Sequence, residues 1–193
     1  HVLAYNAPLY GRRTAQMKIL PFDFDECCAY LSGSSDEDKA YIYGIVGGTP
    51  QYLLQINDKL SVEDNIKNTY LNPMSFLYEE PLNLLKQEVR EPAIYNAIIT
   101  AVATGYSRMS EISAKVGEST TVCSGYLKNL IELGIIRKET PYGEKASKKT
   151  IYSIEDNMFY FWYRFVPDNA SAIARGAENL VYKKVKSELN DYM

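Results

Sequence analysis

The stretch that decides the fold is SRMSEISAKVGESTTVCSGYLKNLIELGIIRKETPYGEKASKKTIYSI, from Ser107 to Ile154. Apolar residues recur in it at helical spacing, first up to Gly117 and again up to Gly134. Glycine at these positions ends helices because it tolerates the left-handed conformation of a helix C-terminus. The strand that begins at Ile135 then meets an alternating return segment, 150–154. The stretch therefore predicts helix, turn, helix and a two-stranded hairpin.

A further helix is predicted just before this stretch. It runs from Pro92 to Ala103, ends before Gly105, and carries on one face Ile94, Ile98, Ile99 and Val102. Three helices followed by a hairpin, joined by short loops, are typical of a winged helix-turn-helix, a fold that most often contacts duplex DNA. We expect this unit to cover residues 91–156.

The preceding residues, 22–90, are predicted to form a compact bundle of five or six short helices. One of them is capped by Ser35 or Ser34 and another by Ser61, and acidic residues follow each cap, as the helix dipole favours. Thr49-Pro50 begins another helix, because threonine caps helices and proline suits the first helical position. Pro81 is expected to divide residues 75–90 into two helical pieces.

The two ends of the chain are expected to differ from these units. Residues 1–21 are predicted to be an extended segment with a short strand, since Pro8 and Pro21 discourage a helix. Residues 157–193 open with the aromatic run MFYFWYRFV from Met158, whose rings cover every helical face and so favour packing in a core over stacking on bases. The tail from Ser171 is predicted to be a polar or partly frayed helix. The expected fold is mainly α: a helical bundle, then a winged helix with a small β-hairpin.

Composition narrows the class of protein. The chain has 193 residues, is 46% hydrophobic and carries a net charge of −3, so any nucleic-acid binding must come from a local patch. The single histidine, His1, and the lack of a CxxC pair remove the usual zinc spacings, and no metal site is expected. Cys27, Cys28 and Cys123 are expected to be free thiols of a cytoplasmic protein, with one of the adjacent pair buried. No apolar run is long enough to span a membrane.

If the winged helix binds DNA, its third helix would present its first exposed residues to base edges. The candidates for this contact are Ser119, Thr120, Thr121, Ser124 and Lys128. Most are small hydrogen-bonding side chains, a pattern that does not predict strong direct readout of bases.

The hairpin is the second candidate for DNA contact, because from Arg137 to Thr150 it carries five basic residues and only two acidic ones. Lysines there could neutralise phosphates, and binding would then weaken steeply with salt. The residues proposed for this contact are Lys145, Lys148 and Lys149. The alternative is that these lysines only solvate a hairpin and that the winged helix packs against other domains.

The step Gly47-Gly48-Thr49-Pro50 is another candidate site. Two glycines at a helix junction allow close approach to the backbone, and Pro50 offers a flat apolar surface at a helix start. A tight turn between two helices is the alternative interpretation.

The order of several segments resembles the C-terminal half of the archaeal-type P-loop ATPases, relatives of the AAA and STAND classes. These segments are PLYGRRT from Pro8, ILPFDFDE from Ile19, EDKAYIYGIVGGTPQYL from Glu37, FLYEEPLNLLKQEVREPAIYNAII from Phe76 and SKKTIYSIEDNMFYFWYRFV from Ser147. The resemblance covers nearly all of residues 5–170. It implies an AAA-like helical lid at about 22–90, a winged helix, and the start of a restriction-nuclease-like domain at 157–193. In full-length members a nucleotide-binding domain precedes them.

The resemblance also implies roles for four residues. Gly48 and Pro50 match the step that in STAND-type lids abuts the adenine, and Arg12 or Arg13 would sense phosphate or a neighbouring subunit, a surface ion pair being the alternative. ATP and Mg would bind the full-length parent. This sequence contains no GxxxxGK[ST] cradle, so it is not expected to hydrolyse ATP or to hold these cofactors alone.

The expected function is therefore that of a lid and winged-helix fragment of a P-loop ATPase, coupling nucleotide state to DNA or protein binding; a start at His1 fits such a fragment. The implied partners are a nucleotide-binding domain outside the sequence, double-stranded DNA and another copy of the chain, with no membrane. One alternative is a stand-alone winged-helix transcriptional regulator that binds DNA. Another is a structural adaptor that binds no nucleic acid.

Overall fold

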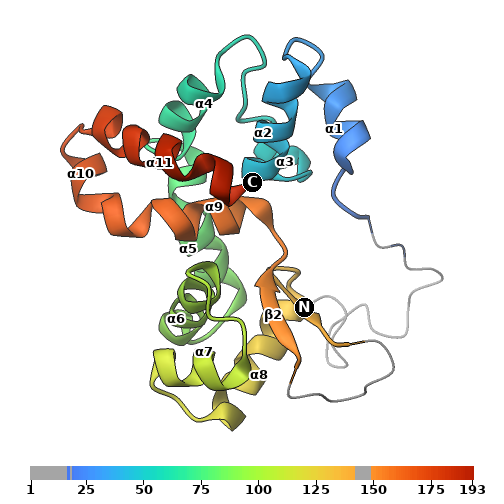
Figure 1. The fold of residues 1–193 in the computed structure, drawn as a ribbon, viewed down its shortest axis with the longest axis vertical. Coiled ribbons are helices and arrows are strands. Elements are labelled where there is room, and N and C mark those ends of the chain that lie inside the picture. The colour runs from blue at the N-terminus through green and yellow to red at the C-terminus, as the bar shows by residue number, and fades with distance from the viewer. Residues whose placement is uncertain (1–16, 18, 142–148) are drawn as a thin grey trace.

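The chain is mainly helical, with one small antiparallel sheet in the described part. The computed structural model describes residues 17, 19–141 and 149–193. Figure 1 shows α1–α4, α10 and α11 in the upper half, α6–α8 and the hairpin in the lower half, and α9 crossing between them. The elements are α1 (Phe24–Tyr30), α2 (Asp36–Val46), α3 (Pro50–Leu53), α4 (Val62–Thr69), α5 (Phe76–Glu88), α6 (Pro92–Ala103), α7 (Met109–Val116), α8 (Thr120–Glu132), β1 (Ile136–Glu139), β2 (Ile151–Ile154), α9 (Asn157–Phe165), the 3₁₀ turn η1 (Pro167–Asn169), α10 (Ala170–Ala174) and α11 (Glu178–Tyr192).

Serine caps set the starts of several helices. The hydroxyls of Ser35, Ser61, Ser75 and Ser119 each accept a hydrogen bond from the backbone N–H three residues later. Such a bond satisfies one of the free donors of a helix N-terminus, and losing it costs about 1 kcal/mol. The predicted caps at Ser35 and Ser61 are confirmed, and the cap of α8 is Ser119.

The predicted break at Pro81 is wrong, because α5 runs through it. Leu77, Pro81 and Leu85 lie four residues apart and form one buried stripe, so both halves of the helix pack on the same core. A proline inside a helix removes one internal hydrogen bond and costs about 3 kcal/mol. The Trp162 indole N–H donates to the Tyr78 carbonyl at 2.7 Å, which joins α9 to α5 in the turn that precedes Pro81.

The aromatic run forms the central helix, α9. Phe159, Phe161 and Phe165 are at most 1% exposed, and the Phe161 ring packs against Tyr70 of α4's C-terminal end with 4.6 Å between centroids. The helix packs against α2, α5 and α6, which lie on both sides of the predicted boundary at residue 91. Packing of the aromatic run in a core is thus confirmed. Burying one such ring stabilises the fold by about 1.5–3 kcal/mol.

The tail is helical, as expected, but one face of it is apolar and buried. On α11 that face consists of Val181, Tyr182, Val185 and Leu189, and it packs against α4. Arg164 of α9 pairs with Glu188 at 3.0 Å. The helix continues to Tyr192, so the tail is not frayed.

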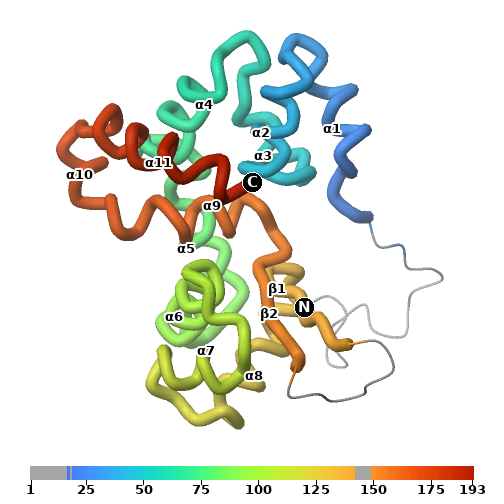
Figure 2. The backbone as a smooth tube through the Cα atoms, viewed as in Figure 1, coloured from blue at the N-terminus to red at the C-terminus, as the bar shows by residue number. Residues whose placement is uncertain are grey.

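The hairpin lies in the lower half (Figure 2) and contacts α6 and α8. Strands β1 and β2 pair antiparallel, with Ile136 opposite Ile154. The Tyr152 N–H donates to the Ser107 carbonyl at 2.8 Å, which joins β2 to the α6–α7 loop. On α8 the buried residues include Cys123 and Leu127, whereas Val122 is 38% exposed. Helical spacing of the apolar residues would place Val122 inward as well, but its neighbour Cys123 takes the buried position.

The described part of the leading segment shows no strand. Met17, Ile19 and Leu20 are exposed and lie in no regular element. Arg12 and Arg13 lie outside the described residues, and so does the rest of the predicted strand. Across the described ranges, every helix is too short or too polar to pass through a membrane.

Candidate functional site

The Gly47–Gly48 step lies at the end of α2, where the chain crosses its own leading segment. Gly47 has φ of +67°, a conformation that favours glycine. The Phe22 N–H donates to the Gly48 carbonyl at 2.9 Å. A Cβ on Gly48 would lie 1.8 Å from the Phe22 carbonyl oxygen. The close approach predicted for this step is therefore made, on that side, by the backbone of Phe22.

Pro50 is the exposed residue of this step. It is the first residue of α3, a helix of four residues that is anchored by buried Tyr52 and Leu53. Gly48 is buried. Of the two residues expected to touch a nucleotide, Pro50 is the one with a surface open to solvent.

The other side of the same step contacts the start of α9. A Cβ on Gly47 would lie 3.6 Å from the Asn157 Cβ, and the Asn157 amide donates to the Tyr43 carbonyl at 2.9 Å. The Tyr192 hydroxyl, at the end of α11, donates to the Gly44 carbonyl at 2.8 Å. The end of α2 is thus held between the leading segment and the β2–α9 junction, although these segments are far apart in sequence.

Asp156 is the residue of this junction whose pKa is shifted towards neutral pH. Its carboxylate accepts the Phe159 N–H at 3.2 Å and so caps α9. Burial raises the pKa of Asp156 to about 6, although hydrogen bonds from the backbone N–H groups of Phe159 and Met158 act in the opposite direction. Burial also raises the pKa of Tyr52, with a smaller contribution from Asp156. A carboxyl group that titrates near neutral pH therefore sits where β2 passes into α9.

The structure places the candidate DNA-contacting residues of α8 on its exposed surface. Ser119, Thr120, Thr121, Ser124 and Lys128 are all exposed. The Ser119 hydroxyl is engaged in capping, accepting the Val122 N–H at 3.2 Å. The Lys128 ammonium lies 3.9 Å from the Glu132 carboxylate, and both side chains are well exposed, so this pair contributes little.

The hairpin is less basic in its described part than the sequence suggests. The Arg137 guanidinium lies 2.8 Å from Glu139 and 3.6 Å from Glu155, and it donates to Ser153 at 2.9 Å. Lys149 is exposed at the start of the return segment. Lys145 and Lys148 lie outside the described residues. Over residues 91–156 the sequence has eight basic and eight acidic side chains, so electrostatic attraction to DNA would have to be local.

A groove of about 620 Å³ runs beside α8, and sequence reasoning missed it. Its walls are the face of α8 that carries Gly125 and Tyr126 and the α5–α6 junction at 88–91. The Tyr126 hydroxyl donates to Glu91, and this bond is the main cause that raises the pKa of Tyr126 to about 12. No atom lies within 4 Å of where a Cβ on Gly125 would be. The sequence signal for this groove was Gly125, a glycine in the middle of a predicted helix. Glycine weakens a helix, and no neighbouring atom requires a glycine here.

The cysteines form no disulfide in the described part of the chain. All three cysteines are free; Cys27 and Cys123 are buried and Cys28 is half-buried, which confirms the expectation for the adjacent pair. Burial raises the pKa of Cys27 to about 11. Among the described residues, no cluster of His, Cys, Asp and Glu side chains could hold a metal ion.

Comparison with known proteins finds a relative that matches along the whole chain. The chain is 36% identical, over all of its 193 residues, to the uncharacterized protein MJECL04 of Methanocaldococcus jannaschii. The chain spans 43% of the length of that relative. No family model matches the chain. No solved structure matches it either.

Proposed function

We propose that this chain is the C-terminal lid and winged-helix part of a P-loop ATPase, and that it couples nucleotide state to the binding of DNA or of a protein. In this proposal residues 22–90 are the lid and residues 91–156 the winged helix. ATP and Mg bind a nucleotide-binding domain outside the chain, in the cytoplasm. The length of the relative, of which the chain spans 43%, leaves room for such a domain and supports the proposal.

The assignment of a winged helix is supported by the order and contacts of the lower half. Helices α6, α7 and α8 pack on one another and precede the hairpin. Gly117, with φ of +81°, reverses the chain between α7 and α8. The hydrogen bond from Tyr152 to Ser107 joins the hairpin to the loop between α6 and α7 and so supports packing of the hairpin on these helices.

The observation that carries the proposed coupling is the position of Gly47–Gly48 between Phe22 and Asn157. Phe22 lies on the segment that would come from the nucleotide-binding domain, and Asn157 begins the central helix directly after the hairpin. A nucleotide beside Pro50 would contact α3 and lie next to the Gly47–Gly48 step. A displacement there would move Phe22 and α9 together, because both are in contact with the same two glycines.

The test uses the full-length gene product. Pro50→Ala is expected to weaken ATP binding several-fold, because it removes an apolar surface next to the proposed adenine position. Asn157→Ala is expected to leave ATP affinity within about twofold while reducing the difference in partner affinity with and without ATP, a coupling that is typically about 1–3 kcal/mol. Asn190→Ala, which removes only an exposed hydrogen bond from Tyr41, is the matched control.

Three results would contradict the proposal. A full-length gene product without a P-loop would remove its basis. ATP affinity that is unchanged in Pro50→Ala would remove the contact assigned to that residue, and coupling that survives Asn157→Ala would place the transmission elsewhere.

A stand-alone DNA-binding regulator is the second candidate, because the exposed surface of α8 gathers Ser, Thr and Lys side chains. The two candidates differ in what the isolated 193-residue chain does. A regulator would bind a specific duplex without any nucleotide, whereas the lid and winged-helix unit would bind weakly and mainly through phosphates.

A further inference from the structure

The solvent face of α5 carries two opposite charges separated by two helical turns. Glu79 and Lys86 are both exposed, and Leu82 lies between them on the same face with 36% of its surface exposed. Seven residues of helix place the two charges about 10 Å apart along the axis. Within the described residues, neither charge takes part in an ion pair or hydrogen bond.

This face forms one wall of a groove of about 440 Å³. The opposite wall is the C-terminal half of α9 with η1, and it contributes Trp162, Val166 and Pro167, so the lining is mainly apolar. Tyr163, which also lines the groove, donates a hydrogen bond to Asn96 of α6, and Trp162 is bonded to the Tyr78 carbonyl. These bonds fix the two walls, so the groove exists before any partner arrives.

The charge pattern on this surface is self-complementary. If two α5 helices pack antiparallel around a two-fold axis beside Leu82, Glu79 of each helix faces Lys86 of the other. The contact is made twice, as every contact is in an interface with two-fold symmetry. Leu82 of each copy then enters the apolar part of the opposite groove. A parallel arrangement would place like charges together, which costs free energy.

We propose that this surface binds a second copy of the same chain, with the two α5 helices antiparallel and Glu79 paired with Lys86 across the two-fold axis. The inference does not depend on the proposed ATPase or DNA function. The occupant is another copy because the two halves of the charge pattern on this one helix match each other.

The test is sedimentation equilibrium of the 193-residue chain at about 1–100 μM and at low salt, where charge pairs are least screened. The wild-type chain is expected to dimerise. Glu79→Lys and Lys86→Glu should each weaken dimerisation at least about tenfold, because each creates two like-charge contacts. The double variant Glu79→Lys/Lys86→Glu should restore it. An equimolar mixture of the two single variants should form heterodimers, since both lysines of one chain then face glutamates of the other.

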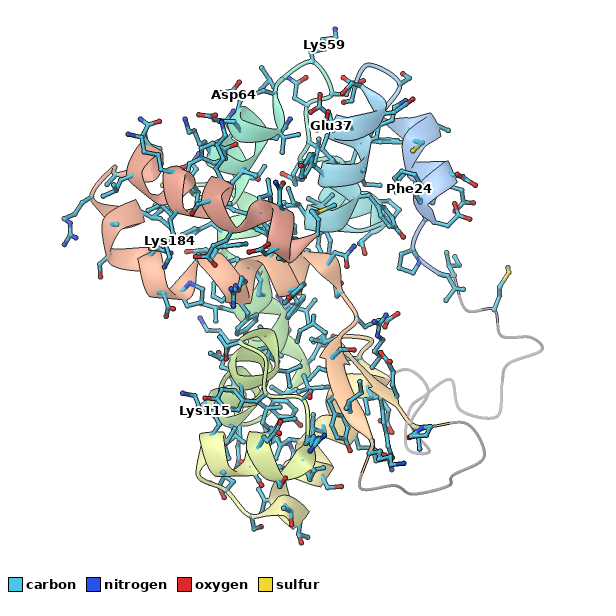
Figure 3. The ribbon with its side chains drawn as sticks, viewed as in Figure 1. Phe24, Glu37, Lys59, Asp64, Lys115 and Lys184 are labelled. Atoms are coloured by element: carbon cyan, nitrogen blue, oxygen red, sulfur yellow. The ribbon has the colours of Figure 1, made fainter. Side chains whose placement is uncertain are left out.

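Matched controls separate the charge pairing from general effects. Lys59→Glu changes the charge by the same amount on an exposed loop at the far end of the upper half (Figure 3), and it should leave dimerisation unchanged. Leu82→Ser should weaken dimerisation and should not be rescued by the charge swap. Circular dichroism melting verifies that each variant is folded.

Three results would overturn the inference. The first is a wild-type chain that stays monomeric throughout this range. The second is a dimer whose dissociation constant is unchanged by both charge reversals, which would locate the interface elsewhere. The third is a folded double variant that does not regain dimerisation.

Discussion

The carbonyl oxygen of Phe22 occupies the space in which a side chain at Gly48 would begin. A Cβ there would be 1.8 Å from that oxygen, and the same two residues share a backbone hydrogen bond of 2.9 Å. The step thus joins the leading segment to the end of α2. Any motion of the leading segment must involve this contact.

Gly48→Ala is expected to destabilise the chain by about 2–3 kcal/mol, because overpacking against a backbone atom forces the chain apart. Urea unfolding measures the difference. Gly125→Ala is the matched control: its Cβ would meet no atom within 4 Å, and it should stabilise the chain by about 0.5–1 kcal/mol. Equal effects of the two substitutions would show that Phe22 does not pack on Gly48.

Asp156 is expected to make stability depend on pH. Its folded-state pKa of about 6 lies above the unfolded value, so its contribution to stability is full below about pH 4 and is lost as the pH rises through about 6. The loss is on the order of 2 kcal/mol. Asp156→Asn should remove this fall while keeping the helix cap, since asparagine caps equally well. This prediction is tested by measuring the free energy of unfolding at pH 4.5 and 7.5, at about 25 °C. The same change between the two pH values in the wild-type chain and in Asp156→Asn would refute it.

Trp162→Phe is expected to lower the free energy of unfolding by about 1–2 kcal/mol, because the half-buried Tyr78 carbonyl would lose the donor that the indole N–H supplies. Chemical denaturation followed by far-ultraviolet circular dichroism measures the loss. Tyr41→Phe, which removes an exposed hydrogen bond to Asn190, should cost less than about 0.5 kcal/mol. A similar small loss for both would mean that the indole N–H does not support α5.

If the hairpin contacts DNA, changing Lys145, Lys148 and Lys149 to Glu should weaken duplex binding. The slope of log affinity against log salt should also fall by about three, because each lysine would neutralise one phosphate. The control is the triple change to Glu of Lys183, Lys184 and Lys186, three exposed lysines of α11. Unchanged affinity in the hairpin variant would exclude these lysines from DNA binding.

Much of the candidate site could be predicted where the signal was local. The exposure of Thr121, Ser124 and Lys128 follows from helical periodicity. A cap at Ser119 or Thr120 follows from hydroxyls ahead of an apolar run, and the structure places it at Ser119. The partner of Gly48 could not be predicted, because Phe22 is 26 positions away and no local pattern links them. The two grooves were also beyond sequence reasoning, since each has walls from helices that meet only in the folded chain.

The sequence by itself determined where most helices begin and end, the hairpin and the apolar character of residues 158–166. These features depend on caps, glycines and periodicity, which act within a few residues. Only the tertiary structure decided that α5 continues through Pro81 and that α9 lies at the centre of the fold. In both cases the packing of side chains distant in sequence outweighs the local preference, because burial of several apolar groups exceeds the few kcal/mol that a proline costs.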